Sequence, residues 1–208
     1  MQHKRDQFIA TLGKFAPVRC VEYLADCIIE ARVQFKIVRG RKTKLGDFRA
    51  QSNKEKPVIT VNGNLNEYSF LITSLHELAH LDTYRLHGNL VAPHGKEWKT
   101  AFAKRLLPLL DAKLLPEDLH QAVYESLHRL KATSGSDLRL SRILKSYDTQ
   151  QALHLEQLPF KALFMLQNKV FIKGELRRTR YLCTEKSSKR IYLIHALAAI
   201  TPLTNDQQ

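Results

Sequence analysis

The order of apolar and polar residues divides the first part of the chain into helices followed by short strands. Apolar residues recur at helical spacing through residues 4–32, which predicts two helices, with Pro17 in the first turn of the second. Three segments then show the apolar alternation or β-branched content typical of strands: 33–38, 45–50 and 58–61. The turn residues that follow, 62–64, end this strand-rich region.

The middle of the chain is predicted to be helical. Apolar positions keep a helical period from Phe70 to Leu86, and either Asn64 or Asn66 offers a side chain that can cap this helix. The helix should end near Gly88. Three further helices are expected at 94–107, 116–131 and 138–147, and residues 132–135 should form a loop.

From Phe160 onward the sequence contains short β-like runs at 170–172, 179–183 and 191–194. These runs predict a small C-terminal β-meander. We therefore expect a mixed α+β protein in three parts. These parts are a main domain of residues 1–131, a linker with a short basic helix at 132–157, and a small β-rich basic domain at 158–208. Four apolar residues should supply the core of the last part: Phe164, Phe171, Ile172 and Leu193.

Composition is that of a soluble globular protein, with 44% hydrophobic and 25% charged residues among 208. No apolar run reaches the roughly 18 residues that a membrane span needs, and the N-terminus lacks the apolar segment of a signal peptide. Cys20, Cys27 and Cys183 form no CxxC pair and no even disulfide framework. These features predict a cytoplasmic protein without a membrane partner.

The net charge of +13 points to a partner, because such an excess favours a polyanion, either nucleic acid or an anionic membrane surface. One basic tract is the turn 39–44, and a second lies on the C-terminal β-runs beside Tyr181. The candidate nucleic-acid contacts in the second tract are Arg177, Arg178, Arg180, Lys186, Lys189 and Arg190. A solvated basic surface is the alternative, since a run of charge is weak proof of binding.

The segment HELAHL, residues 76–81, carries the clearest chemistry in the sequence. Residues four apart share a helix face, so His76 and His80 can direct two imidazole nitrogens at one metal ion. Glu77 lies one step round the helix, where a carboxylate can take a proton from a zinc-bound water. The pattern therefore predicts a catalytic zinc site, with Glu77 as the catalytic base.

A catalytic zinc needs a third protein ligand. The extended pattern HExxHxxGxxH would place glycine and histidine where this chain has Thr83 and Leu86. Glu97 on the following helix is one candidate ligand, and His94 is the better one. The turn at 88–93 lets the chain fold back, and His94 opens the next helix.

HELAHL followed by HGKEW, with KLGDFR and VITVN before it, resembles the SprT-like zinc metalloproteases. This family is related to the Spartan proteases, which digest proteins cross-linked to DNA, and the resemblance spans roughly residues 20–130. It implies a zincin-like fold for residues 1–131, with Trp98 packed behind a single catalytic zinc. The implied zinc ligands are His76, His80 and His94, and the implied general base is Glu77.

The resemblance implies a zinc-dependent endopeptidase that acts on DNA-associated or DNA-cross-linked proteins. The tail departs from the pattern, because many bacterial relatives end in a cysteine zinc ribbon and this chain has only Cys183 there. We therefore expect a ribbon-like tail without structural zinc. Two alternatives stay open: a DNA-binding module on a catalytically silent zincin scaffold, and a metallohydrolase of small substrates.

Overall fold

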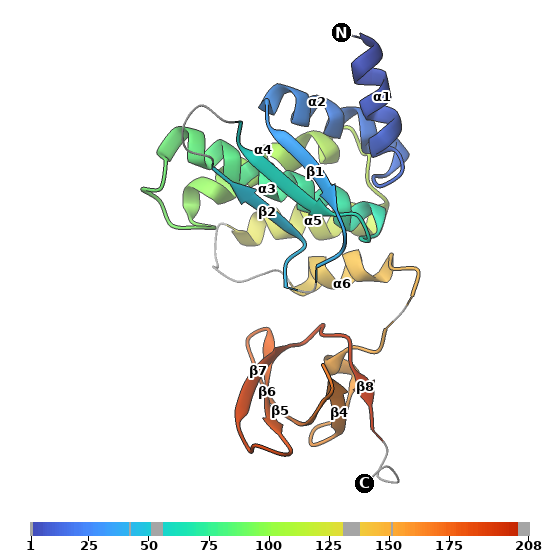
Figure 1. The fold of residues 1–208 in the computed structure, drawn as a ribbon, viewed down its shortest axis with the longest axis vertical. Helices are drawn as coiled ribbons and strands as arrows, with labels where there is room; N and C mark the ends of the chain where they lie inside the picture. Colours follow the sequence, from blue (N-terminus) through green and yellow to red (C-terminus); the bar gives the residue numbers. More distant parts are fainter. Residues whose placement is uncertain (1, 42, 51–55, 131–137, 151, 204–208) are drawn as a thin grey trace. The chain divides into compact units, whose positions relative to one another are not determined.

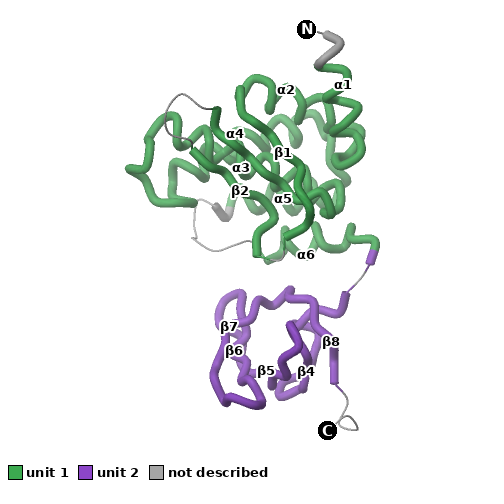
Figure 2. Tube along the Cα trace, in the orientation of Figure 1, with its two compact units in different colours: residues 1–149 green, residues 150–208 purple. Residues whose placement is uncertain are grey.

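The structure is a computed structural model that describes residues 2–41, 43–50, 56–130, 138–150 and 152–203 (Figure 1). The chain divides into two compact units, residues 1–149 and 150–208 (Figure 2). The first unit combines helices with a small sheet and the second consists mainly of strands, which confirms the mixed α+β class. None of the helices in the described ranges is long and apolar enough to cross a membrane.

Two helices and a single 3₁₀ turn open the first unit: α1 (Gln2–Leu12), η1 (Val18–Cys20) and α2 (Val21–Ala31). Pro17 precedes the 3₁₀ turn instead of lying in the first turn of an α-helix. Arg32 ends α2 in a left-handed conformation, with a φ of 49°, and its N–H bonds to the Ile29 carbonyl. The apolar face of α2 is part of the main core, where Leu24 is fully buried.

A three-stranded sheet follows, made of β1 (Gln34–Val38), β2 (Gly46–Arg49) and β3 (Val58–Asn62) in the order β1-β3-β2. Strand β3 pairs in parallel with β1 and antiparallel with β2. The central position of β3 explains why Ile59 and Val61 are fully buried. Strand β2 is left at an edge of the sheet, with α3 packed against it.

Helix α3 (Glu67–His87) is the central helix of the unit. Asn66, one of the two candidate caps, accepts a hydrogen bond from the Ser69 N–H at 2.8 Å. Gly88 ends the helix with a φ of 58°, a conformation that glycine adopts without strain. The helix thus begins and ends close to where its sequence predicts.

Three helices complete the first unit: α4 (Lys96–Asp111), α5 (Glu117–Leu130) and α6 (Leu138–Ser146). Helix α4 begins after His94 instead of at it, and continues through Pro108 beyond the predicted end. The Arg105 guanidinium of α4 holds the Asp82 carboxylate of α3 through bonds of 2.7 and 2.8 Å. The loop expected at 132–135 lies outside the described residues. Helix α6 belongs to the first unit, because it packs on α5 and α3.

The second unit contains one 3₁₀ turn, η2 (Leu155–Gln157), and a five-stranded antiparallel sheet in the order β7-β6-β5-β4-β8. The strands are β4 (Leu163–Leu166), β5 (Lys169–Arg177), β6 (Arg180–Glu185), β7 (Ile191–His195) and β8 (Thr201–Pro202). Four consecutive strands pair with their neighbours along the chain, which gives the expected meander. The closing strand β8 pairs with β4.

The core of the second unit differs in part from its predicted composition. Phe164 and Phe171 are buried in it, but Leu193 is 54% exposed, so the prediction for Leu193 is wrong. The register pairs Tyr192 with Cys183 on the inner face of the sheet, and strand alternation therefore turns Leu193 to the outer face. Ile172 is half-buried.

Candidate metal centre

The side chains of His76, His80 and His94 converge on one point. The Nε2 atom of His80 lies 3.2 Å from that of His76 and 3.1 Å from that of His94. The third side of the triangle, from His94 Nε2 to His76 Nε2, is also 3.1 Å. No other group of three metal-ligating side chains occurs within the described ranges.

Two different local structures bring the histidines together. His76 and His80 are one turn apart on α3, which places their rings on the same face of the helix. His94 lies in the turn before α4 with a φ of 59°, and the Gly95 N–H closes this turn on the Ala92 carbonyl at 2.9 Å. This left-handed conformation at His94 turns the chain back toward α3 before α4 begins.

An aromatic platform supports all three imidazoles. The indole of Trp98 lies 4.6 Å from the His76 ring, 5.3 Å from His80 and 4.7 Å from His94, measured between centroids. Phe102, one turn further along α4, stacks on Trp98 at 4.8 Å. Trp98 is only 5% exposed and packs against all three imidazole rings, the position that the resemblance implies for it.

The electrostatic environment favours neutral imidazoles. Burial, and then the neighbouring histidines, lower the pKa of His76 to about 3. The same causes lower the pKa of His80 to about 4, and burial also lowers the pKa of His94. Neutral imidazole is the form that binds a metal ion, so this side-chain set is ready to act as ligands near neutral pH.

The geometry fits a shared cation. Each neutral imidazole nitrogen presents either a lone pair or an N–H, so at least two of the three Nε2 atoms must present the same group to one point. A cation resolves this conflict by accepting all three lone pairs. Tetrahedral zinc, with zinc–nitrogen bonds of about 2.0–2.1 Å, separates its ligand nitrogens by about 3.3 Å. The distances of 3.1–3.2 Å are close to that value.

The carboxylate of Glu77 lies beside the edge strand β2. Glu77 is 7% exposed, and a Cβ added to Gly46 would lie 2.5 Å from its Oε1 atom. Burial, and next the nearby Asp47 carboxylate, raise the pKa of Glu77 to about 7, while a hydrogen bond from the Phe48 backbone N–H opposes them. The sequence marks Gly46 only as part of a strand, so its contact with Glu77 was missed.

A buried asparagine fixes the approach to β2. The Nδ2 group of Asn62 donates to the carbonyls of Arg41 and Lys44 at 3.2 and 2.9 Å. The Arg41 guanidinium returns a bond of 2.8 Å to Asn62 Oδ1 and one of 3.0 Å to Thr60. Lys44 pairs with Asp47 at 2.8 Å. These two cations of the basic turn are therefore engaged inside the unit, close to Glu77.

The candidate nucleic-acid contacts of the second unit are all exposed: Arg177, Arg178, Arg180, Lys186, Lys189 and Arg190. Arg178 lies in the turn between β5 and β6 with a φ of 57°, so it does not share a strand face with Arg180. The ring of Tyr181 lies 4.1 Å from the ammonium of the buried Lys173. Tyr181 therefore faces the interior and is not placed to stack on a base beside Arg180.

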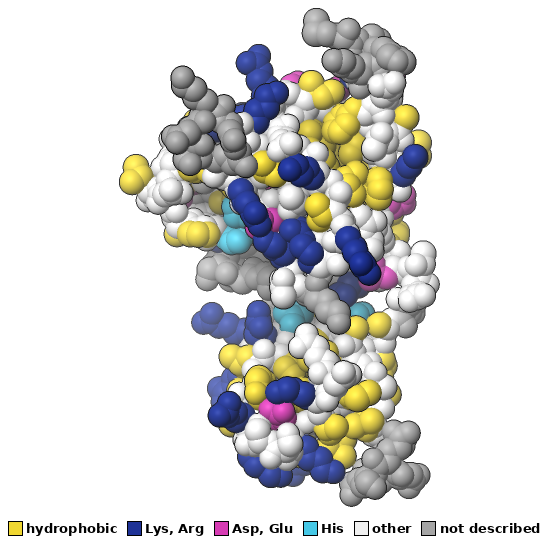
Figure 3. Space-filling view, viewed as in Figure 1, with side chains coloured by type: hydrophobic (Ala, Val, Ile, Leu, Met, Phe, Trp, Pro, Cys, Tyr) yellow, Lys and Arg dark blue, Asp and Glu magenta, His cyan; other side chains and the backbone are white. Residues whose placement is uncertain are grey.

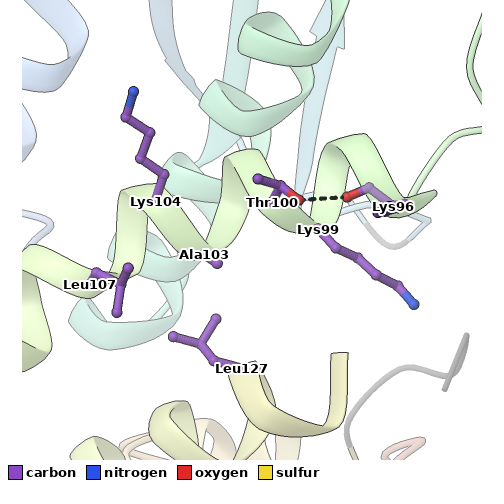
Figure 4. A pocket seen from close by; sticks show the side chains of 7 residues that line it. All are labelled: Lys96, Lys99, Thr100, Ala103, Lys104, Leu107 and Leu127. Carbon is purple, nitrogen blue, oxygen red and sulfur yellow. Dashed lines mark hydrogen bonds between the residues drawn. The ribbon is translucent and has the colours of Figure 1, made fainter. Parts of the chain in front are cut away.

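A separate hollow of about 820 Å³ lies between α4 and α5 (Figure 4). Its walls are formed by Lys96, Lys99, Thr100, Ala103, Lys104, Leu107 and Leu127. Thr100 and Ala103 lie on a different side of α4 from Trp98 and Phe102, so this hollow does not open onto the histidine cluster.

A functional assignment for this chain rests on the geometry of the three histidines and their surroundings. The chain matches no protein-family model, no curated protein and no solved structure.

Proposed function

We propose that the first unit is a zinc-dependent endopeptidase of the SprT-like type, with a zincin-like fold. The observation that carries this proposal is the convergence of three imidazole nitrogens on one point, with the buried Glu77 next to His76 on the same helix. His76, His80 and His94 would hold one zinc ion, and three histidines are a ligand set that leaves a fourth position open for substrate or water. A metal held in this way supplies Lewis acidity and makes a bound water more acidic.

Glu77 acts as the general base in this proposal. Its carboxylate takes a proton from the attacking water and delivers it to the leaving amine as the peptide bond breaks. Trp98 and Phe102 keep the imidazoles in place from behind.

Strand β2 is suited to hold an extended polypeptide. The Asn62 N–H bonds to the Leu45 carbonyl, so alternation directs the backbone groups of Gly46 and Phe48 away from β3. Glu77 accepts a hydrogen bond from that Phe48 N–H. A substrate that adds to β2 as a further strand would therefore pass the carboxylate of Glu77, the proposed general base.

The proposed substrates are proteins associated with or cross-linked to DNA. The support for DNA as a partner is the net charge of +13. Figure 3 shows Lys and Arg side chains spread over the visible face of each unit. A chain that binds DNA through a catalytically silent scaffold accounts for the same charge, so the decisive test must act on catalysis alone.

Cleavage of an unstructured protein substrate tests the proposal. The wild-type chain with one equivalent of zinc should cleave the substrate, and added DNA should increase the rate. Glu77→Gln should lower the rate by about 10²- to 10⁴-fold, since it removes the base while keeping the shape of the side chain. Glu67→Gln, on the exposed first turn of the same helix, should have no effect.

Equal cleavage by wild type and Glu77→Gln would rule out this role for Glu77. DNA binding without any cleavage would favour the silent scaffold. In the DNA arm, replacing Arg177, Arg178, Lys186 and Lys189 together by Gln should weaken binding and flatten its dependence on salt.

A further inference from the structure

Strand β7 is the first strand of its sheet, and nothing in the described part of the chain pairs with its other side. Two backbone bonds fix which groups face outward: Glu185 N–H to the Arg190 carbonyl, and Ala196 N–H to the Thr179 carbonyl. Antiparallel alternation between these bonds turns the backbone of Tyr192 and Ile194 toward β6. The N–H and carbonyl groups of Ile191 and Leu193 therefore point away from the sheet.

The same two residues expose large aliphatic side chains. Ile191 is 68% exposed and Leu193 is 54% exposed. The register places them opposite Thr184 and Leu182, so they belong to the outer face of the sheet. Natural edge strands are usually protected by a lysine, a proline, a bulge or a covering segment, and the sequence IYLIH of β7 carries none of the first two.

Cationic groups stand near both ends of this edge. Arg190 immediately precedes β7, and Arg180 pairs with His195, the last residue of β7, while its guanidinium donates to the Leu193 carbonyl at 3.4 Å. Both side chains are exposed, and neither forms an ion pair within the ranges that the structure describes. An incoming strand with carboxylates near its ends would match this arrangement in charge.

We propose that β7 binds an acidic, extended polypeptide segment, which adds to the sheet as a further strand. The outward backbone groups would pair with it once Arg180 leaves the Leu193 carbonyl, and its apolar side chains would pack on Ile191 and Leu193. Arg180 and Arg190 would meet carboxylates near its ends. This site lies in the second unit and is independent of the metal centre.

Two other occupants fit less well. A second copy of this chain paired through β7 in antiparallel fashion would bring Arg190 of one copy near Arg180 of the other, which is repulsive. Base stacking by single-stranded nucleic acid would need aromatic rings on this face, but Tyr181 and Tyr192 belong to the inner face. Aliphatic side chains with an open backbone edge suit a peptide better.

Fluorescence anisotropy with the full chain tests this proposal. The probe is a labelled short peptide of alternating valine and threonine with two acidic residues at each end. It should bind, and the double variant Ile191→Thr/Leu193→Thr should weaken binding at least tenfold. Threonine keeps β-propensity at both positions, so the sheet should persist, as a circular dichroism spectrum can verify. Phe160→Thr, at another exposed position of the unit, is the matched control.

Two further variants separate the backbone and charge contributions. Leu193→Pro removes an outward N–H without touching the bonds to β6, and should abolish binding. Arg180→Glu/Arg190→Glu should also abolish it, and should favour the same peptide with lysine ends. Failure of the acidic peptide to bind, or equal binding by wild type and Ile191→Thr/Leu193→Thr, would overturn the proposal. The proposal would also be overturned if Ile191→Thr/Leu193→Thr lost oligonucleotide binding or self-association while it still bound the peptide.

Discussion

At Gly46, a Cβ atom would lie 2.5 Å from Oε1 of Glu77 and 2.7 Å from Cγ2 of Thr73. Both distances are shorter than any normal contact, so a side chain at this position has to move one of these groups. The Glu77 carboxylate is the end of a flexible side chain and is the easier one to displace. The position of the proposed base thus depends on the absence of a side chain on a neighbouring strand.

Gly46→Ala should therefore lower peptidase activity without removing metal. The carboxylate of Glu77 would shift while His76, His80 and His94 keep their geometry. We expect turnover to fall at least tenfold, because small displacements of a catalytic group are costly. Steady-state kinetics and zinc analysis of the same preparation would check this. A variant that loses zinc in proportion to its activity would contradict the proposed arrangement.

Local sequence rules predict His76 and His80 well, because residues four apart share a helix face whatever the rest of the fold does. The link to His94 is harder, since it depends on a left-handed turn that histidine seldom adopts. The contact between Gly46 and Glu77 depends on how β2 packs against α3, and no local pattern reports that packing. Local sequence likewise does not decide between Asn64 and Asn66 as the cap of the helix.

Among the elements, α3 depends on Asn66 at its start. The Asn66 side chain accepts from the Ser69 N–H, and its Nδ2 group donates to the Leu144 carbonyl and to Asp148 at 2.8 and 2.6 Å. One residue therefore caps the helix that carries HELAHL and attaches the end of α6 to it. The prediction of a separate linker helix missed this attachment, because a contact 78 residues apart has no local signature.

Asn66→Ala should destabilise the first unit by about 2 kcal/mol, since it removes both the cap and the attachment. Asn66→Ser keeps an oxygen for the cap but loses the amide donor, so it should cost about half as much. Urea unfolding followed by fluorescence of Trp98 isolates the first unit, because this is the only tryptophan in the chain. Equal stability of the Ala and Ser variants would mean that the cap contributes little.

Register limits prediction in the second unit. The sequence identifies most of its strands, but the face on which each residue lies depends on pairing with the next strand. Leu193 was expected in the core and lies on the outer face, whereas Lys173 is buried and donates to the carbonyls of Glu156 and Leu158. An apolar residue outside and a cation inside both follow from the observed register.

At the scale of the whole molecule, each of the two units has its own core. The second unit holds a buried carboxylate, Glu185, which accepts from Ser188 at 2.6 Å and pairs with Lys169 at 3.1 Å. The hydrogen bond from Ser188, and next that from Lys169, lower the pKa of Glu185 from 4.5 to about 2. The folded unit therefore prefers the ionised form.

This pKa predicts acid sensitivity of the second unit. A carboxyl group whose pKa is lowered by folding stabilises the fold at any pH above its pKa in the unfolded chain. This contribution is lost as the pH falls from about 4.5 toward 2. Amide exchange of β5 and β6, corrected for intrinsic rates, should show protection that declines through this range. Glu185→Gln should be less protected at neutral pH and should change little with acid. An unchanged acid response in that variant would assign the effect to other groups.

Zinc content is the most direct test of the central claim. Purified wild type, supplied with excess zinc and then desalted, should retain about one zinc per chain by elemental analysis. His94→Asn should lose or greatly weaken this binding, because asparagine tolerates the left-handed turn and supplies no imidazole. His87→Gln, at the end of the α3 helix that carries His76 and His80, should retain it. Absence of zinc in the wild type, or full retention by His94→Asn, would contradict the three-histidine metal centre and the peptidase that rests on it.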